Sequence, residues 1–143
     1  MKILLKISFI MILAFSFTST SGAQEELYNK LNKKLAVLYK QGKTDEAIKV
    51  AEKALQVAKK TYGEKHPYVS ASLNNMALLY IAEGKYDKAE ELCEKSLKIA
   101  EEILGKDSPH LANILENMVK CNDKMGKREK VETLEARLDQ IRE

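Results

Sequence analysis

The chain has 143 residues, of which 45% are hydrophobic, and this length fits one domain of ordinary size rather than two. Tryptophan is absent, and there are only two prolines and six glycines, a composition that favours helices over strands. Of the 24 lysines and arginines, Lys2 and Lys6 lie in the N-terminal segment, and the remaining 22 nearly balance the 21 acidic residues. Nucleic-acid-binding domains usually carry a clustered basic excess, so this balance argues against a nucleic-acid partner.

The first 23 residues have the three parts of a secretory signal. Residues 1–6 are positively charged, residues 7–17 form an apolar run, and residues 18–23 are mostly small and polar. The alternative is a retained anchor helix. An apolar run of 11 residues is, however, well short of the roughly 20 needed to span a bilayer, so a cleaved signal is the better interpretation.

The expected cleavage site lies between Ala23 and Gln24, because Ser21 and Ala23 offer the small side chains that a signal peptidase requires. Cleavage would leave a mature domain of residues 24–143. We expect this domain to be periplasmic or secreted, with no membrane insertion once the signal is removed.

A 42-residue period organises the mature domain. The residues that repeat at this interval are Gly42, Gly84 and Gly126, each followed by a lysine, then Gly63 and Gly105, and Pro67 and Pro109. The period predicts three repeats, at about residues 28–69, 70–111 and 112–143.

Apolar residues within each repeat follow the i, i+3, i+4, i+7 spacing of helices that bury one face. The spacing and the glycine and proline markers predict helices at about 25–41, 44–61, 67–83, 86–104, 109–125 and 128–142. Two helices cannot bury their apolar stripes alone, so the hairpins must stack. The predicted fold is all-α, a right-handed α-solenoid of three helix-turn-helix repeats, with the last helix as a terminal cap.

The middle repeat resembles the tetratricopeptide repeat (TPR), in the 42-residue form found in kinesin light chains. The matching residues are Ser72-Leu73-Asn74-Asn75-Met76-Ala77-Leu78-Leu79-Tyr80, Glu83-Gly84-Lys85-Tyr86-Asp87-Lys88-Ala89-Glu90, Leu104-Gly105 and Ser108-Pro109. The outer repeats depart from this pattern. Residues 35–39 match only if one residue is deleted before Gly42, which predicts a first helix one residue shorter. In the third repeat, Asn122, Arg128 and Val131 replace two aromatic residues and an alanine, so looser packing is expected there.

The resemblance implies a concave groove that is lined by the first helix of each hairpin and binds a partner protein or peptide. Asn75 and Asn117 hold the position at which relatives often grip a peptide main chain, and an amide both donates and accepts hydrogen bonds. Asn74, Leu78 and Ile81 would form the middle of the groove floor.

Lysines would make the ends of this groove basic. Under the shifted register Lys34 is the equivalent of Asn75 in the first repeat, with Lys33 and Lys40 nearby, and Lys120 and Lys124 lie in the third repeat. Such a surface suits an acidic segment of the partner. An ordinary solvated face explains the same lysines equally well.

No catalytic or nucleotide-binding motif occurs in the sequence, so we expect no enzyme activity, no cofactor and no metal. His66 and His110 flank the turns between repeats and are expected to be structural. Cys93 and Cys121 lie on apolar helix faces, where two buried free thiols are the preferred interpretation and a disulfide is the alternative.

The sequence therefore predicts an exported scaffold or adaptor. One alternative is a self-associating module that pairs through an apolar face including Leu27 and Leu31, which would form a homo-oligomer. Another is a non-catalytic accessory subunit of an exported enzyme complex.

Overall fold

The computed structural model describes the backbone of residues 2–143 and the side chains of residues 21–143. Most of the predicted signal, residues 1–20, therefore lies outside the described side chains. The elements are α1 (Lys2–Lys40), α2 (Thr44–Tyr62), α3 (Pro67–Ala82), α4 (Tyr86–Leu104), the short 3-10 helix η1 (Pro109–Leu111), α5 (Ala112–Lys124) and α6 (Arg128–Arg142). The described residues include no strand, and 85% of the chain is helical.

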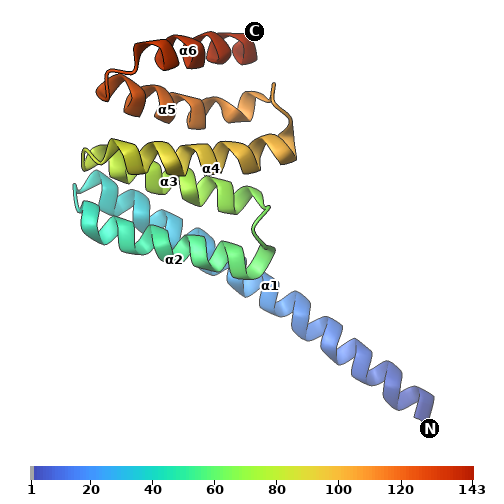
Figure 1. Cartoon of the computed structure of the whole chain (residues 1–143). Coiled ribbons are helices and arrows are strands. Elements are labelled where there is room, and N and C mark those ends of the chain that lie inside the picture. The colour runs from blue at the N-terminus through green and yellow to red at the C-terminus, as the bar shows by residue number, and fades with distance from the viewer. Residues whose placement is uncertain (1) are drawn as a thin grey trace.

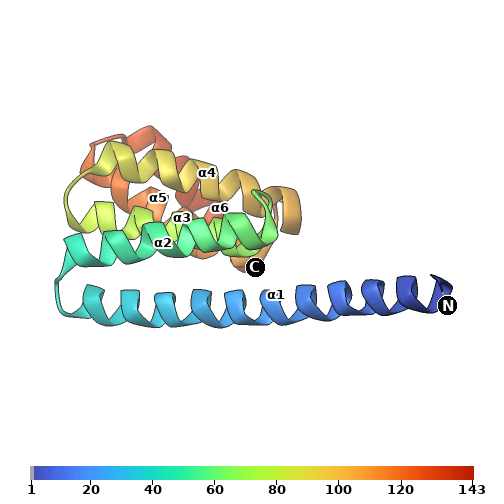
Figure 2. The same ribbon diagram turned by 90° about the horizontal axis from the view of Figure 1, so that it is seen from below.

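The helices pair as three antiparallel hairpins, α1 with α2, α3 with α4 and α5 with α6, which stack in chain order (Figures 1 and 2). Between hairpins, α2 packs on α3, α4 packs on α5, and α3 also contacts α5. The predicted all-α solenoid of three helix-turn-helix repeats is thereby confirmed.

Each hairpin turns at a glycine with positive φ: Gly42 at +71°, Gly84 at +75° and Gly126 at +72°. A side chain would be strained in this left-handed conformation. The backbone N–H after each glycine donates to the carbonyl five residues earlier, from Lys43 to Leu38 and from Lys85 to Tyr80. These acceptors are 42 residues apart, so the deletion predicted before Gly42 is wrong.

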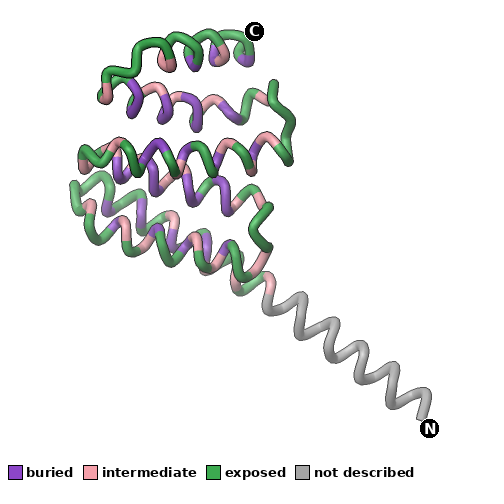
Figure 3. The backbone as a smooth tube through the Cα atoms, viewed as in Figure 1, coloured by how far each residue is buried: buried purple, intermediate pink, exposed green. Residues whose placement is uncertain are grey.

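A stripe of small buried residues lets each hairpin approach the next closely. The stripe consists of Ala47, Ala51, Ala54 and Ala58 on α2, and of Ala89, Cys93, Ser96 and Ala100 on α4. The equivalent residues on α6 are Val131, Glu135, Leu138 and Arg142, which are larger or charged. The buried residues accordingly face neighbouring hairpins, whereas the outer side of α6 is mostly exposed (Figure 3).

Helix α1 begins at Lys2 and not near residue 25 as predicted. No proline interrupts this segment, and Gly22 alone does not stop the helix. No helix among the residues with described side chains is long and apolar enough to cross a membrane.

The third repeat begins with η1 instead of continuous α-helix from residue 109. The Ser108 hydroxyl accepts from the His110 N–H at 3.3 Å, and the Leu111 N–H donates to the Ser108 carbonyl at 3.0 Å. The bond from Leu111 to Ser108 spans three residues and closes the first turn as a 3-10 helix.

Cys93 of α4 and Cys121 of α5 are free thiols with no exposed area. The contact with the Cys121 thiol, together with burial, raises the pKa of Cys93. We expect both thiols to react with an aromatic disulfide reagent only when the protein unfolds, because neither side chain has any exposed area for the reagent to reach. Labelling rates that follow the global unfolding rate across a urea series would agree with this; rapid labelling without urea would contradict it.

Candidate partner-binding surface

Asparagines link the first helices of successive hairpins. Asn75 Nδ2 on α3 donates to Asn32 Oδ1 on α1 at 3.2 Å, and Asn117 Nδ2 on α5 donates to Asn74 Oδ1 at 3.0 Å. The same contact is made at both junctions, and we call these four residues the asparagine ladder. It runs along the face formed by α1, α3 and α5, which we call the first-helix face.

The ladder uses only part of its hydrogen-bonding capacity. An amide has two N–H donors and an oxygen acceptor, and the inter-helix bonds engage one N–H of Asn75 and one of Asn117. Asn32, Asn74 and Asn75 are half-buried and can reach a ligand, whereas Asn117 is only 7% exposed. Asn117 therefore acts mainly by holding Asn74 in place.

Asn32 was not among the predicted site residues, because the deletion assumed before Gly42 shifted the first repeat by one position. It lies 42 residues before Asn74, so the unshifted period would have identified it. The same correction applies to the lysines: Lys33 is the equivalent of Asn75, whereas Lys34 is the equivalent of the buried Met76. Lys34 thus lies on the outer side of the first hairpin, and its predicted equivalence with Asn75 is wrong.

The other predicted residues lie on the first helices. Leu78 and Ile81 are half-buried on α3. The exposed lysines of this face are Lys33 and Lys40 on α1 and Lys120 and Lys124 on α5. Within residues 21–143, none of these four lysines forms an ion pair, so their charges can act on a ligand.

The half-buried His66 caps α3, since its Nδ1 accepts from the Tyr68 N–H at 3.2 Å. Its ring stacks on Tyr62 with 4.3 Å between ring centroids. This geometry gives His66 a structural role, and the exposed His110 contributes its backbone N–H to the turn at Ser108. Among the described residues, no group of three His, Cys, Asp or Glu side chains could hold a metal ion.

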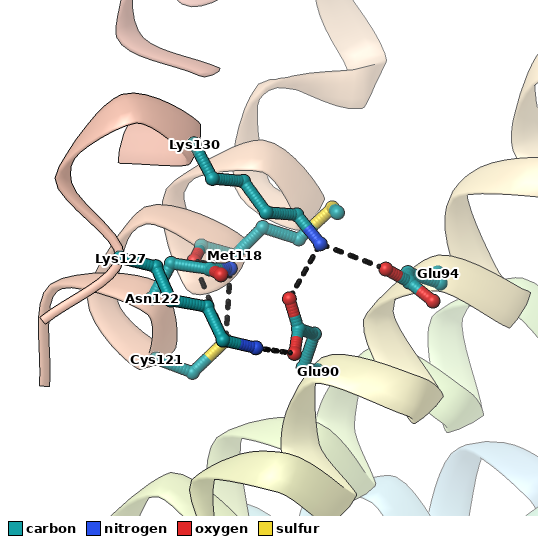
Figure 4. A network of polar contacts seen from close by, with 7 residues as sticks. All are labelled: Glu90, Glu94, Met118, Cys121, Asn122, Lys127 and Lys130. Atoms are coloured by element: carbon teal, nitrogen blue, oxygen red, sulfur yellow. Dashed lines mark hydrogen bonds and ion pairs between the residues drawn. The ribbon is translucent and has the colours of Figure 1, made fainter. Parts of the chain in front are cut away.

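A second polar cluster joins the second and third hairpins (Figure 4). Glu90 of α4 is 9% exposed and accepts from Lys127 Nζ at 2.6 Å and from Lys130 Nζ at 2.5 Å. Lys130 also pairs with Glu94 at 2.9 Å. Burial pushes the pKa of Glu90 upward, but the two ammonium groups outweigh burial and hold the pKa below its ordinary value.

Asn122 shows how this junction differs from the first one. It is fully buried, its Nδ2 donates to the Met118 carbonyl at 2.8 Å, and its Oδ1 has no hydrogen-bond partner. The equivalent residue is Tyr80, over whose ring Lys88 Nζ lies at 4.2 Å. The sequence singled out Asn122 as a departure but gave no sign of the Glu90 cluster, because its members are 37 and 40 residues apart.

Helical hairpins that stack on a small-residue stripe define a helical-repeat protein. A sequence profile of the tetratricopeptide repeat matches residues 27–82 and 68–138. The chain therefore belongs to the tetratricopeptide repeat family, as the middle repeat predicted.

Solved structures agree on the fold. BtubC (BKLC) from P. vanneervenii superposes with a TM-score of 0.76 at 19% identity, over 83% of this chain and 47% of that one. A putative kinesin light chain from Podosopora anserina with nearly identical TPR-like repeats gives 0.68 at 22% identity, over 79% and 52%. This chain thus spans about half the length of either structure. No curated protein matches the sequence.

Proposed function

We propose that the protein is an exported adaptor that binds a segment of a partner protein along its first-helix face. The TPR fold is that of a protein-protein interaction scaffold, and the family is generally non-catalytic. The observation that supports this face is the asparagine ladder, because it presents spare amide groups at a regular spacing beside lysines without ion pairs.

An extended peptide suits such a row of amides. Its main chain offers alternating N–H and C=O groups, and each additional hydrogen bond contributes about 1 kcal/mol. The lysines at both ends favour an acidic segment, while Leu78 and Ile81 offer apolar contact in the middle. Export is supported by the charged, apolar and small-residue parts of residues 1–23.

The double variant Asn75→Ala, Asn117→Ala is expected to bind the partner at least about tenfold more weakly. Asn75→Ala removes one amide of the site, and Asn117→Ala removes the contact that holds the amide of Asn74 in place. Two amides worth about 1 kcal/mol each exceed the 1.4 kcal/mol that corresponds to a factor of ten. Tagged wild-type and variant proteins would be used to capture partners from the cell-envelope fraction, and the partner identified by mass spectrometry would then be titrated.

The matched control is Gln56→Ala, Gln140→Ala, which removes two exposed amides 84 residues apart on the second helices α2 and α6. Circular dichroism and the thermal midpoint would show that each variant is folded. If the partner binds both double variants as tightly as it binds the wild type, the asparagine ladder is not part of the binding site. Export is tested separately, by whether the protein recovered outside the cytoplasm begins at Gln24.

A further inference from the structure

Both ends of the solenoid carry surfaces that are buried between hairpins elsewhere in the chain. At the N-terminal end, Lys30, Lys34 and Val37 are exposed, although the equivalent Ser72, Met76 and Leu79 of α3 are buried. At the C-terminal end, a shallow cleft between α5 and α6 is open where a following hairpin would pack. Its lining includes Glu116, Val119, Glu135, Leu138 and Asp139.

The junction between the second and third hairpins shows which positions meet when hairpins stack. Six polar contacts cross it. Asn117 contacts Asn74 at 3.0 Å, Lys127 and Lys130 contact Glu90 at 2.6 and 2.5 Å, and Lys130 contacts Glu94 at 2.9 Å. Arg137 contacts Glu101 at 2.6 Å and the Lys106 carbonyl at 2.8 Å. In each contact the donor belongs to the third hairpin and the acceptor to the second.

The 42-residue period gives the residues that would meet if a second copy continued the stack. The equivalent of each donor lies 84 residues earlier, in the first hairpin of one copy. The equivalent of each acceptor lies 42 residues later, in the third hairpin of the other copy. Lys33 then faces Glu116, Lys43 faces Glu132, and Lys53 faces Glu143, with the lysines on one copy and the glutamates on the other. These three pairings combine a base with an acid, although the first of them is a pair of neutral amides inside the chain. The equivalent of Lys130 is Glu46, which would lie near Glu132 and Ala136 and which pairs with Lys43 at 4.0 Å in its own copy, so this fourth position opposes the stack.

We propose that the protein self-assembles head to tail, with the basic N-terminal end of one copy stacked on the acidic C-terminal end of the next. This assembly needs no ligand on the first-helix face and is independent of the proposed adaptor function. It also differs from pairing through Leu27 and Leu31. Leu31 is buried in a core cluster shared by the first two hairpins, and Leu27 is half-buried against the same cluster.

Charge argues against symmetric pairing. Two N-terminal ends placed face to face would bring lysines together, and two C-terminal ends would bring Glu132, Glu135 and Asp139 together. The cleft at the C-terminal end also carries two cations, Lys120 and Arg142, and Arg142 pairs with Glu116. The three acids of the cleft, Glu116, Glu135 and Asp139, outnumber these cations. A contact between two different surfaces does not close on itself, so it builds open chains of copies.

The association should be weak. Exposed ion pairs contribute only about 0.2–1 kcal/mol each and are screened by salt. Val131 and Glu135 are also larger than the equivalent Ala89 and Cys93, which limits how closely a second copy can approach. Assembly is therefore expected at high protein concentration and low ionic strength, and it should disappear in high salt.

Sedimentation velocity tests the proposal. The protein is purified in the form that the cell produces and measured over a concentration series at low and at high salt. The wild type should sediment as progressively larger species at low salt. Lys33→Glu with Lys43→Glu should weaken association at least tenfold, and so should Glu116→Lys with Glu132→Lys. Mixing the two variants should restore assembly, because each acidic end then faces a basic one.

The matched control is Lys49→Glu with Lys98→Glu. Both lysines are exposed. The equivalent of Lys49 is Glu91 and that of Lys98 is Gln56, and these two residues are exposed as well. Neither position is therefore buried between hairpins. The control should assemble like the wild type. A wild type that stays monomeric at every concentration, or reversed-charge variants that assemble as the wild type does, would overturn the proposal.

Discussion

Leu79→Ala is expected to lower the free energy of unfolding by about 3 kcal/mol and the thermal midpoint by roughly 6–12 °C. Leu79 has no exposed area and belongs to the cluster of buried residues that extends from Leu35 of the first hairpin to Ile141 of the third. Removing its side chain leaves a cavity that rigid neighbouring helices cannot fill. In a stack of only three hairpins, weakening the middle one also weakens both junctions.

Leu78→Ala is the matched control for Leu79→Ala. The neighbouring Leu78 is half-buried on the first-helix face, so its truncation should cost about 1–2 kcal/mol, clearly less than that of Leu79. Urea unfolding followed by circular dichroism gives both values. Equal losses for Leu78→Ala and Leu79→Ala would show that the interface between hairpins does not carry the stability of the middle repeat.

Glu90→Gln is expected to destabilise the protein by about 2 kcal/mol at neutral pH, because it leaves the ammonium groups of Lys127 and Lys130 without their carboxylate. The pKa of Glu90 is lowered by folding, so the carboxylate stabilises the protein fully above its ordinary value of 4.5. This contribution is lost as the pH falls through the lower pKa of the folded state. The variant should therefore lose less stability than the wild type on acidification below about pH 4.5.

Glu91→Gln controls for a general effect of removing a carboxylate. Glu91 is exposed and pairs with Lys95 one turn along the same helix, an arrangement that contributes little in water. Its loss should leave the stability nearly unchanged at every pH. If Glu90→Gln and the wild type show the same change of stability with pH, the Glu90 cluster does not stabilise the junction.

The repeats could be predicted from the sequence because they depend on local signals. The hairpin turns depend on glycines that adopt positive φ, and the helices on an apolar stripe with a regular period, so Gly42, Gly84 and Gly126 located all three turns. The start of α5 was harder to predict. At Pro67 the His66 carbonyl accepts from the Ser70 N–H as well as from the Val69 N–H, so an α-helix starts there. At Pro109 the Ser108 carbonyl accepts from the Leu111 N–H three residues later, which gives a 3-10 turn.

The candidate site could be predicted only in part. Asn74, Asn75, Leu78 and Ile81 were found because the middle repeat matches the family pattern closely, and the first-helix face follows from that pattern. The assumed deletion before Gly42 displaced the first repeat by one position. A shift of one residue turns a helix position by about 100°, which moved Lys34 onto the wrong face and left Asn32 unnoticed.

By itself the sequence determined the family, the number of repeats and the position of each hairpin turn, because these are set by spacing along the chain. Only the tertiary structure showed which side chains meet across a junction. Asn75 bonds to Asn32, Asn117 is buried against Asn74, and Lys127 and Lys130 bond to Glu90. Each of these contacts joins residues 37 to 43 positions apart. Such contacts depend on how one hairpin packs on the next, and no local pattern of residues specifies that packing.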